Sequence, residues 1–152
     1  MSLTDRAKAL RLRIEATHPE QARQLVSFAW ACVHKASLPR LRGRGRLQTA
    51  LLVVQRWLTG EPVEQRLRAM HDDVFEAALG VGRFEAEMTG LRAACWSVFE
   101  LYQAALATTS GERQAVPHKT AWAAVLAARS GDDGLMSSAL EYQEELFAKL
   151  FH

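Results

Sequence analysis

Apolar residues recur three and four positions apart along nearly the whole chain, and this spacing is the feature that most restricts how it can fold. Residues at that spacing share one face of an α-helix, whereas a half-buried strand needs alternation at every second position. The pattern is clearest between Phe84 and Ala105. There, steps of four and three carry Phe84, Met88, Leu91, Cys95, Val98, Tyr102 and Ala105. They predict a long helix packed nearly parallel or antiparallel to a neighbour, and Gly90 inside it indicates a close helix contact.

The same periodicity predicts helices in the rest of the chain, separated by glycine, proline and short polar segments. Their expected ranges are about 3–16, 17–38, 47–58, 63–78, 117–129 and 135–151. The run 51–54 on its own fits a strand, but the longer window around it favours a helix. The sequence therefore predicts an all-α fold, a single-domain bundle of about seven helices without a sheet over residues 1–152.

Length and composition are those of one ordinary globular domain. The chain has 152 residues, of which 49% are hydrophobic and 24% charged, and this excludes disorder as a whole. Cys32 and Cys95 lie far apart inside apolar helical patterns, which predicts two reduced core thiols rather than a disulfide scaffold. No secretory leader opens the chain, and no apolar run reaches the roughly 18 residues of a membrane span. We therefore expect a cytoplasmic protein without membrane contact.

Charge is unevenly distributed along the chain. Residues 1–47 carry ten Lys and Arg against three Asp and Glu, whereas residues 48–152 carry nine against fourteen. Such asymmetry is compatible with a polyanion-binding face, with two faces for two partners, or with ordinary surface chemistry. The sign alone does not decide among them.

Motifs for catalysis are absent, with one arrangement that merits attention. The sequence has no P-loop, dinucleotide fingerprint, CxxC or HExxH, so no catalytic residue and no cofactor are predicted. His71-Asp72, with His34 upstream and Asp132 or Asp133 downstream, resembles the order of metal ligands in all-helical HD-type phosphohydrolases. Polar residues precede the dipeptide where that family is apolar, and an amphipathic helix would place Asp72 in solvent. An HD-type metal-dependent phosphohydrolase is therefore kept as the enzymatic alternative.

Four arginines alternate in the loop after the second expected helix, at Arg40, Arg42, Arg44 and Arg46. Guanidinium groups bind phosphates well, so this loop is a weak anion-binding hypothesis. Nucleic-acid segments usually add stacking aromatic residues, and none occurs between Leu38 and Leu47. We therefore interpret these arginines as solvated and do not expect a nucleic-acid partner.

Acidic residues gather on the last expected helix, at Glu141, Glu144 and Glu145, with Tyr142 among them. An aromatic anchor inside a charged rim is typical of protein interfaces. These four residues are our predicted protein-binding surface, and their charge favours a basic partner.

Several segments together resemble one known family. They are Leu38-Pro39, Ala50, the run Arg56-Trp57-Leu58-Thr59-Gly60-Glu61, and the Ala-rich stretch 93–107. Over about residues 25–128 the chain resembles the helical predicted immunity proteins of bacterial polymorphic toxin systems. The resemblance implies a small, non-catalytic cytoplasmic protein that binds and neutralises a cognate toxin.

Three residues match the motif of that family, and the resemblance implies structural roles for them. Trp57 would anchor the core, Gly60 would stop a helix in the left-handed conformation, and Glu61 would lie near the next helix N-terminus. The chain departs from the family in its Gly-Arg loop and in its long 108–116 loop.

The sequence thus favours a non-catalytic protein-binding domain, an immunity protein with a toxin as partner. A regulatory or structural helical interaction module is the closest alternative, and self-association into a homodimer stays open.

Overall fold

Helix α6 (Gly90–Thr109) lies at the centre of the molecule, and α7 (Val116–Arg129) packs along it. In this computed structural model, which describes residues 1–151 except the side chain of Asp133, the other helices surround that pair. They are α1 (Leu3–Glu15), α2 (Ala22–Ala36), α3 (Gly45–Leu58), α4 (Glu64–Ala69), α5 (His71–Leu79) and α8 (Asp133–Leu150). Short 3-10 turns occupy Pro19–Gln21, Leu38–Arg40 and Arg113–Ala115. Residues 1–151 contain no strand, so the prediction of an all-α fold is confirmed, including a helix over residues 51–54.

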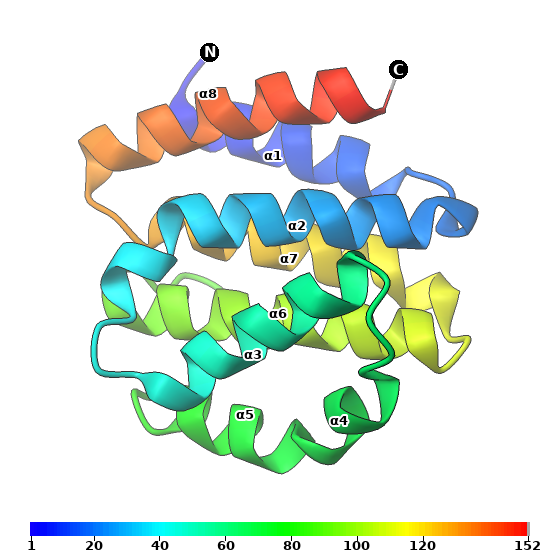
Figure 1. Cartoon of the computed structure of the whole chain (residues 1–152). Coiled ribbons are helices and arrows are strands. Elements are labelled where there is room, and N and C mark those ends of the chain that lie inside the picture. Colours follow the sequence, from blue (N-terminus) through cyan, green and yellow to red (C-terminus); the bar gives the residue numbers. More distant parts are fainter. Residues whose placement is uncertain (152) are drawn as a thin grey trace.

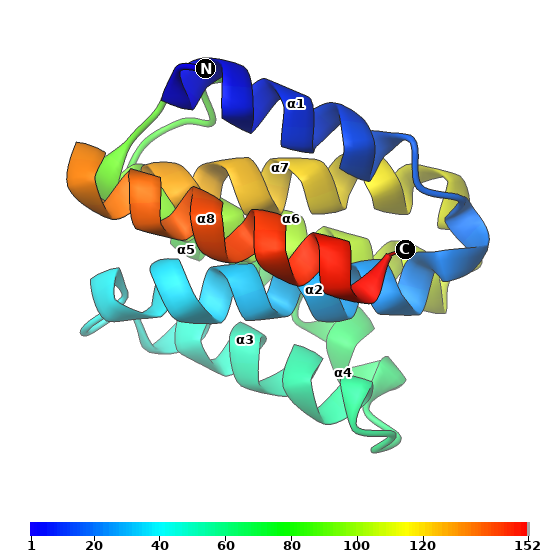
Figure 2. The ribbon, with the colours of Figure 1, turned by 90° about the horizontal axis from the view of Figure 1, so that it is seen from above.

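The helices are stacked in layers around α6 and α7 (Figure 1). Helices α1 and α8 cover one side, where both contact α7 and α8 also contacts α2. Helices α3, α4 and α5 cover the other side and contact α6. Viewed from above, α8 runs between α1 and α2 (Figure 2).

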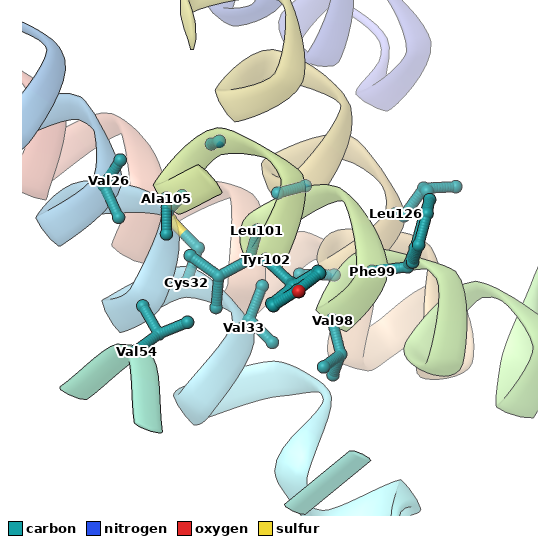
Figure 3. Packing of buried hydrophobic residues seen from close by; sticks show 14 of the residues in the cluster. Val26, Cys32, Val33, Val54, Val98, Phe99, Leu101, Tyr102, Ala105 and Leu126 are labelled. Carbon is teal, nitrogen blue, oxygen red and sulfur yellow. The ribbon is translucent and has the colours of Figure 1, made fainter. Parts of the chain in front are cut away.

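Small side chains allow the two central helices to approach closely. All residues from Ala93 to Tyr102 of α6 are buried, and α7 contains a series of buried alanines: Ala121, Ala123, Ala124, Ala127 and Ala128. A helix that is buried on every side must be apolar on every side, which explains the Ala-rich composition of this stretch. Figure 3 shows side chains of α2, α3, α6 and α7 meeting in this core, among them Cys32, Tyr102 and Leu126.

The predicted helix over 63–78 is instead two helices, α4 and α5, which meet at Met70. In a continuous helix the carbonyl of Leu67 would accept the backbone N–H of His71. Here the hydroxyl of Tyr102 donates a hydrogen bond to that carbonyl from the centre of the core. The break between α4 and α5 leaves the Leu67 carbonyl without a donor from its own helix, and Tyr102 supplies one.

The predicted helix over 84–105 begins only at Gly90, and residues 80–89 form an irregular segment apart from short turns. Thr89 before it is extended, and Gly90 has a φ of 62°, a conformation that favours glycine. A Cβ atom added at Gly90 would meet nothing within 4 Å, so the interpretation of Gly90 as a close helix contact is wrong. Phe84 and Met88 consequently lie outside the helix that their spacing predicted.

Both cysteines are free and buried, as expected for core thiols. Burial raises the pKa of both thiols above the ordinary value, and it does so strongly for Cys32. Among residues 1–151, no helix combines the length and apolarity needed to cross a membrane.

Replacing Tyr102 with Phe should destabilise the fold, because it leaves the carbonyl of Leu67 buried without its donor. Burial raises the pKa of Tyr102 to about 12, so the hydroxyl keeps its proton at neutral pH. Loss of such a partner costs roughly 1–3 kcal/mol, which urea unfolding would measure. The control is Tyr142→Phe, because the only other tyrosine of the chain is half-buried on α8. Equal losses in the two variants would contradict the proposed role of the Tyr102 hydroxyl.

Candidate protein-binding surface

The four residues of the predicted acidic surface lie on different sides of α8. Glu144 forms an ion pair with Arg6 of α1, on one flank of α8. Tyr142 lies on the other flank, where Lys35 of α2 sits over its ring with Nζ 4.6 Å from the ring centroid. Glu141 and Glu145 are exposed on the outer side. The structure therefore leaves two of the four predicted residues together on an open surface.

The four arginines at 40, 42, 44 and 46 are all exposed. Leu41 between them is buried, and Gln48 of α3 donates a hydrogen bond of 2.9 Å to its carbonyl. Arg46 lies 3.8 Å from Glu76 of α5, measured from Nη1 to Oε2. The loop is thus anchored by an apolar residue while its guanidinium groups face solvent.

The residues of the metal hypothesis belong to different elements, and most of them have local partners. His71 begins α5, and its Nδ1 lies 3.3 Å from Oδ1 of Asp72. His34 stacks on a tryptophan ring of its own helix α2. Asp132 caps α8 by accepting a backbone N–H bond, and the side chain of Asp133 lies outside the described residues. Within the described part of the chain, no three His, Cys, Asp or Glu side chains are grouped as a metal site.

The three family-motif residues lie at the end of α3. Trp57 is buried, and Arg23 of α2 covers its ring at 4.6 Å while donating a hydrogen bond to its carbonyl. Gly60 has a φ of 92° and donates to the Trp57 carbonyl, while the N–H of Glu61 donates to the Arg56 carbonyl. This pair of bonds is a Schellman motif, which ends the helix.

A second surface is built from aromatic rings of α5, α6, α7 and the segment before α6. The sequence patterns did not predict it. We define this aromatic patch by Phe75, Phe84, Trp96, Phe99 and Trp122. Phe84 lies between the two tryptophans, with its ring centroid 5.6 Å from that of Trp96 and 5.4 Å from that of Trp122. Both contacts are edge-to-face, a geometry that aromatic pairs favour.

The segment 80–89 that carries Phe84 is held at several points. Trp96 donates a hydrogen bond of 2.9 Å from Nε1 to the carbonyl of Gly82, and Arg129 donates one to the carbonyl of Ala86. Arg92 forms an ion pair with Glu85 at 3.1 Å. Met88 inserts into the core and is 4% exposed. These contacts fix an otherwise irregular segment and position Phe84.

Gly82 fits this arrangement because it allows a close approach. It has a φ of 133°, and a Cβ atom there would lie 2.5 Å from Nε of Arg92. The guanidinium group therefore occupies the space that any other residue type would need.

Part of the patch is exposed although it is apolar. Phe75 and Phe84 are each 39% exposed, and Leu79, four residues after Phe75 on α5, is 41% exposed. Residues 71–92 carry acidic side chains around these apolar ones, at Asp72, Asp73, Glu76, Glu85 and Glu87, against only Arg83 and Arg92. An exposed aromatic centre with a charged rim is the composition of many protein interfaces.

The spacing of apolar residues concealed this surface. Phe84 fits the heptad spacing of the helix that follows, and this spacing predicts a buried position for it. The Gly80-Val81-Gly82 stop and Thr89-Gly90 are the residues that could have indicated an irregular segment between two helices.

No family model, curated protein or solved structure was found to match this chain. The geometry of the surface and the sequence resemblance are therefore the two observations that bear on function.

Replacing Trp96 with Phe should loosen the 80–89 segment, because it removes the donor to Gly82 while keeping an aromatic ring. One net hydrogen bond contributes about 1 kcal/mol, so we expect roughly fivefold faster limited cleavage by trypsin after the exposed Arg83. Trp122→Phe is the matched control, since the Trp122 ring touches Phe84 without a hydrogen bond to the segment. Unchanged cleavage in Trp96→Phe would show that this bond does not hold the segment.

Proposed function

We propose that this chain is a non-catalytic protein-binding domain that docks a basic partner protein on its aromatic patch. Following the resemblance, the partner is a cognate toxin, and the chain acts as an immunity protein that neutralises it. The observation that carries the proposal is Phe84, an exposed aromatic side chain on a segment held by three side chains of α6 and α7.

A held aromatic residue is suited to tight binding. Ordering a flexible segment on association costs free energy, and that cost is small where the segment is already fixed in the free protein. Aromatic side chains near the centre of an interface commonly contribute most of its binding free energy. Phe84 and Phe75 both pack against Trp96 and are partly exposed, so they offer such aromatic side chains.

The charge of the surroundings supports a basic partner. Residues 71–92 carry five acidic residues against two arginines, and this negative balance is reduced but not removed by Arg46 beside Glu76 and Arg129 beside Ala86. Complementary charge accelerates association and disfavours partners of the same sign. The outer side of α8, with Glu141 and Glu145, is a second acidic region that supports the same sign of partner.

Two alternative functions differ from this proposal, one in the identity of the partner and the other in requiring a metal site. A regulatory or structural helical module would use the same surface for a partner that is not a toxin. We do not propose the HD-type phosphohydrolase, because its expected ligands His34, His71, Asp72 and Asp132 are not grouped as a metal site within the described part of the chain.

The decisive experiment measures binding to the effector domain encoded by the neighbouring gene, by calorimetry, and protection by co-expression. Phe84→Ala should weaken binding by about thirtyfold, the loss of roughly 2 kcal/mol typical of an interface hot spot. Because Phe84 also packs on Trp96 and Trp122, urea unfolding of the variant would check that the fold is retained. Leu52→Ala is the matched control, since Leu52 is an apolar residue of α3 that is 45% exposed.

The same experiment separates the two acidic surfaces. If the double variant Glu141→Lys with Glu145→Lys abolishes protection and Phe84→Ala does not, the interface lies on α8 and the aromatic patch is not the docking surface. If the parent chain binds no product of a neighbouring gene, the immunity function is wrong.

A further inference from the structure

A hollow of about 390 Å³ lies between the end of α2, the turn Leu38–Arg40, the end of α7 and the start of α8. Its walls are mainly apolar and small, and they include Ala36, Ala128 and Ala139, with Leu135 53% exposed at the rim. Small-molecule sites commonly have volumes of roughly 300–1,000 Å³ and mostly apolar walls. This hollow therefore has the size and lining of a ligand pocket.

The buried polar group of the wall is already satisfied. The hydroxyl of Ser130 lies 2.6 Å from the carbonyl of Ala127 and 3.0 Å from that of Ala36, both of which can accept its bond. The interior of the hollow thus offers little to a polar ligand body and favours an aliphatic or aromatic one.

Two positively charged side chains line the hollow. Lys35 and Arg40 are its charged lining residues among those described, and neither forms an ion pair with another described residue. Lys35 also borders a second, more open hollow of about 480 Å³ that contains Trp30, His34 and Tyr142. The described lining of both hollows includes no acidic side chain.

We propose that this pocket binds an amphiphilic carboxylate. Its apolar chain would fill the space between Ala36, Ala128 and Ala139, and its carboxylate would face Lys35 and Arg40. A carboxylate would form an ion pair with Arg40 and with Lys35, which in the free protein lies over the Tyr142 ring. A neutral amphiphile would gain no such ion pair, and a cationic one would be repelled. The proposal is independent of the aromatic patch and of the toxin as partner.

The test titrates the protein with decanoate, decanol and decylamine, which share one chain length, and measures binding by calorimetry. We expect decanoate to bind about tenfold more tightly than decanol, and decylamine to bind more weakly than either. The fluorescence of Trp30, beside the second hollow, gives an independent signal. Equal affinities for decanoate and decanol would overturn the proposal, because the cations would then have no role.

Two kinds of variant locate the site. Lys35→Gln with Arg40→Gln should lower the affinity for decanoate about tenfold and leave that for decanol unchanged. Ala139→Leu, or Ala36→Leu should the first variant fold poorly, should abolish binding of both by filling the hollow. Lys149→Gln at the other end of α8 removes one positive charge and is the control for net charge, compared with each single variant, Lys35→Gln and Arg40→Gln. An equal loss of affinity in Lys149→Gln would place the carboxylate elsewhere and contradict the proposal.

A second copy of the chain is the competing occupant of the hollow. Sedimentation at increasing concentration would detect a dimer. A dimer that Ala139→Leu dissociates, together with no binding of decanoate, would replace the ligand pocket by a self-association surface.

Discussion

The constraint on which the structure depends is the burial of α6 on every side. Its central residues must be apolar or locally satisfied, and its partner α7 must be lined by alanine to reach it closely. The few polar groups on α6 show how strict this is. The Ser97 hydroxyl lies 2.7 Å from that of Ser37, and Glu100 lies 3.5 Å from Nζ of Lys119. Burial raises the pKa of the Glu100 carboxyl, while the charge of Lys119 opposes this rise.

The local periodicity of the chain was enough to predict most of its helices, because apolar residues recur at helical spacing both in α6, which is buried on every side, and in the helices that bury one face. The two errors lie where a tertiary contact acts against the local pattern. At Met70 the helix breaks over a carbonyl that Tyr102 satisfies from a distance of 35 residues in sequence. Before Gly90, the heptad spacing continues through residues that are not helical. Spacing records which residues are apolar, but it does not record the backbone conformation between them.

The candidate site was harder to predict for a related reason. The sequence shows charge clusters, motifs and unusual residues most clearly, and these predicted an interface on α8. There, one glutamate is used to hold α8 against α1, and Tyr142 lies against Lys35 of α2. The aromatic patch contains residues that resemble core in any linear analysis. Only the folded chain distinguishes Trp96, which is 4% exposed, from Phe84, which is 39% exposed beside it.

This difference in exposure between Trp96 and Phe84 is the strongest physical argument that the aromatic patch is a binding surface. A segment of ten residues without a helix would gain stability by turning Phe84 fully inward, as Met88 does. Instead, a tryptophan, two arginines and a glycine with positive φ fix its backbone so that the ring stays partly in solvent. These contacts constrain the segment, while a large part of the apolar area of Phe84 remains without a partner inside the chain. A partner that covers this ring would complete the burial that the isolated fold leaves unfinished.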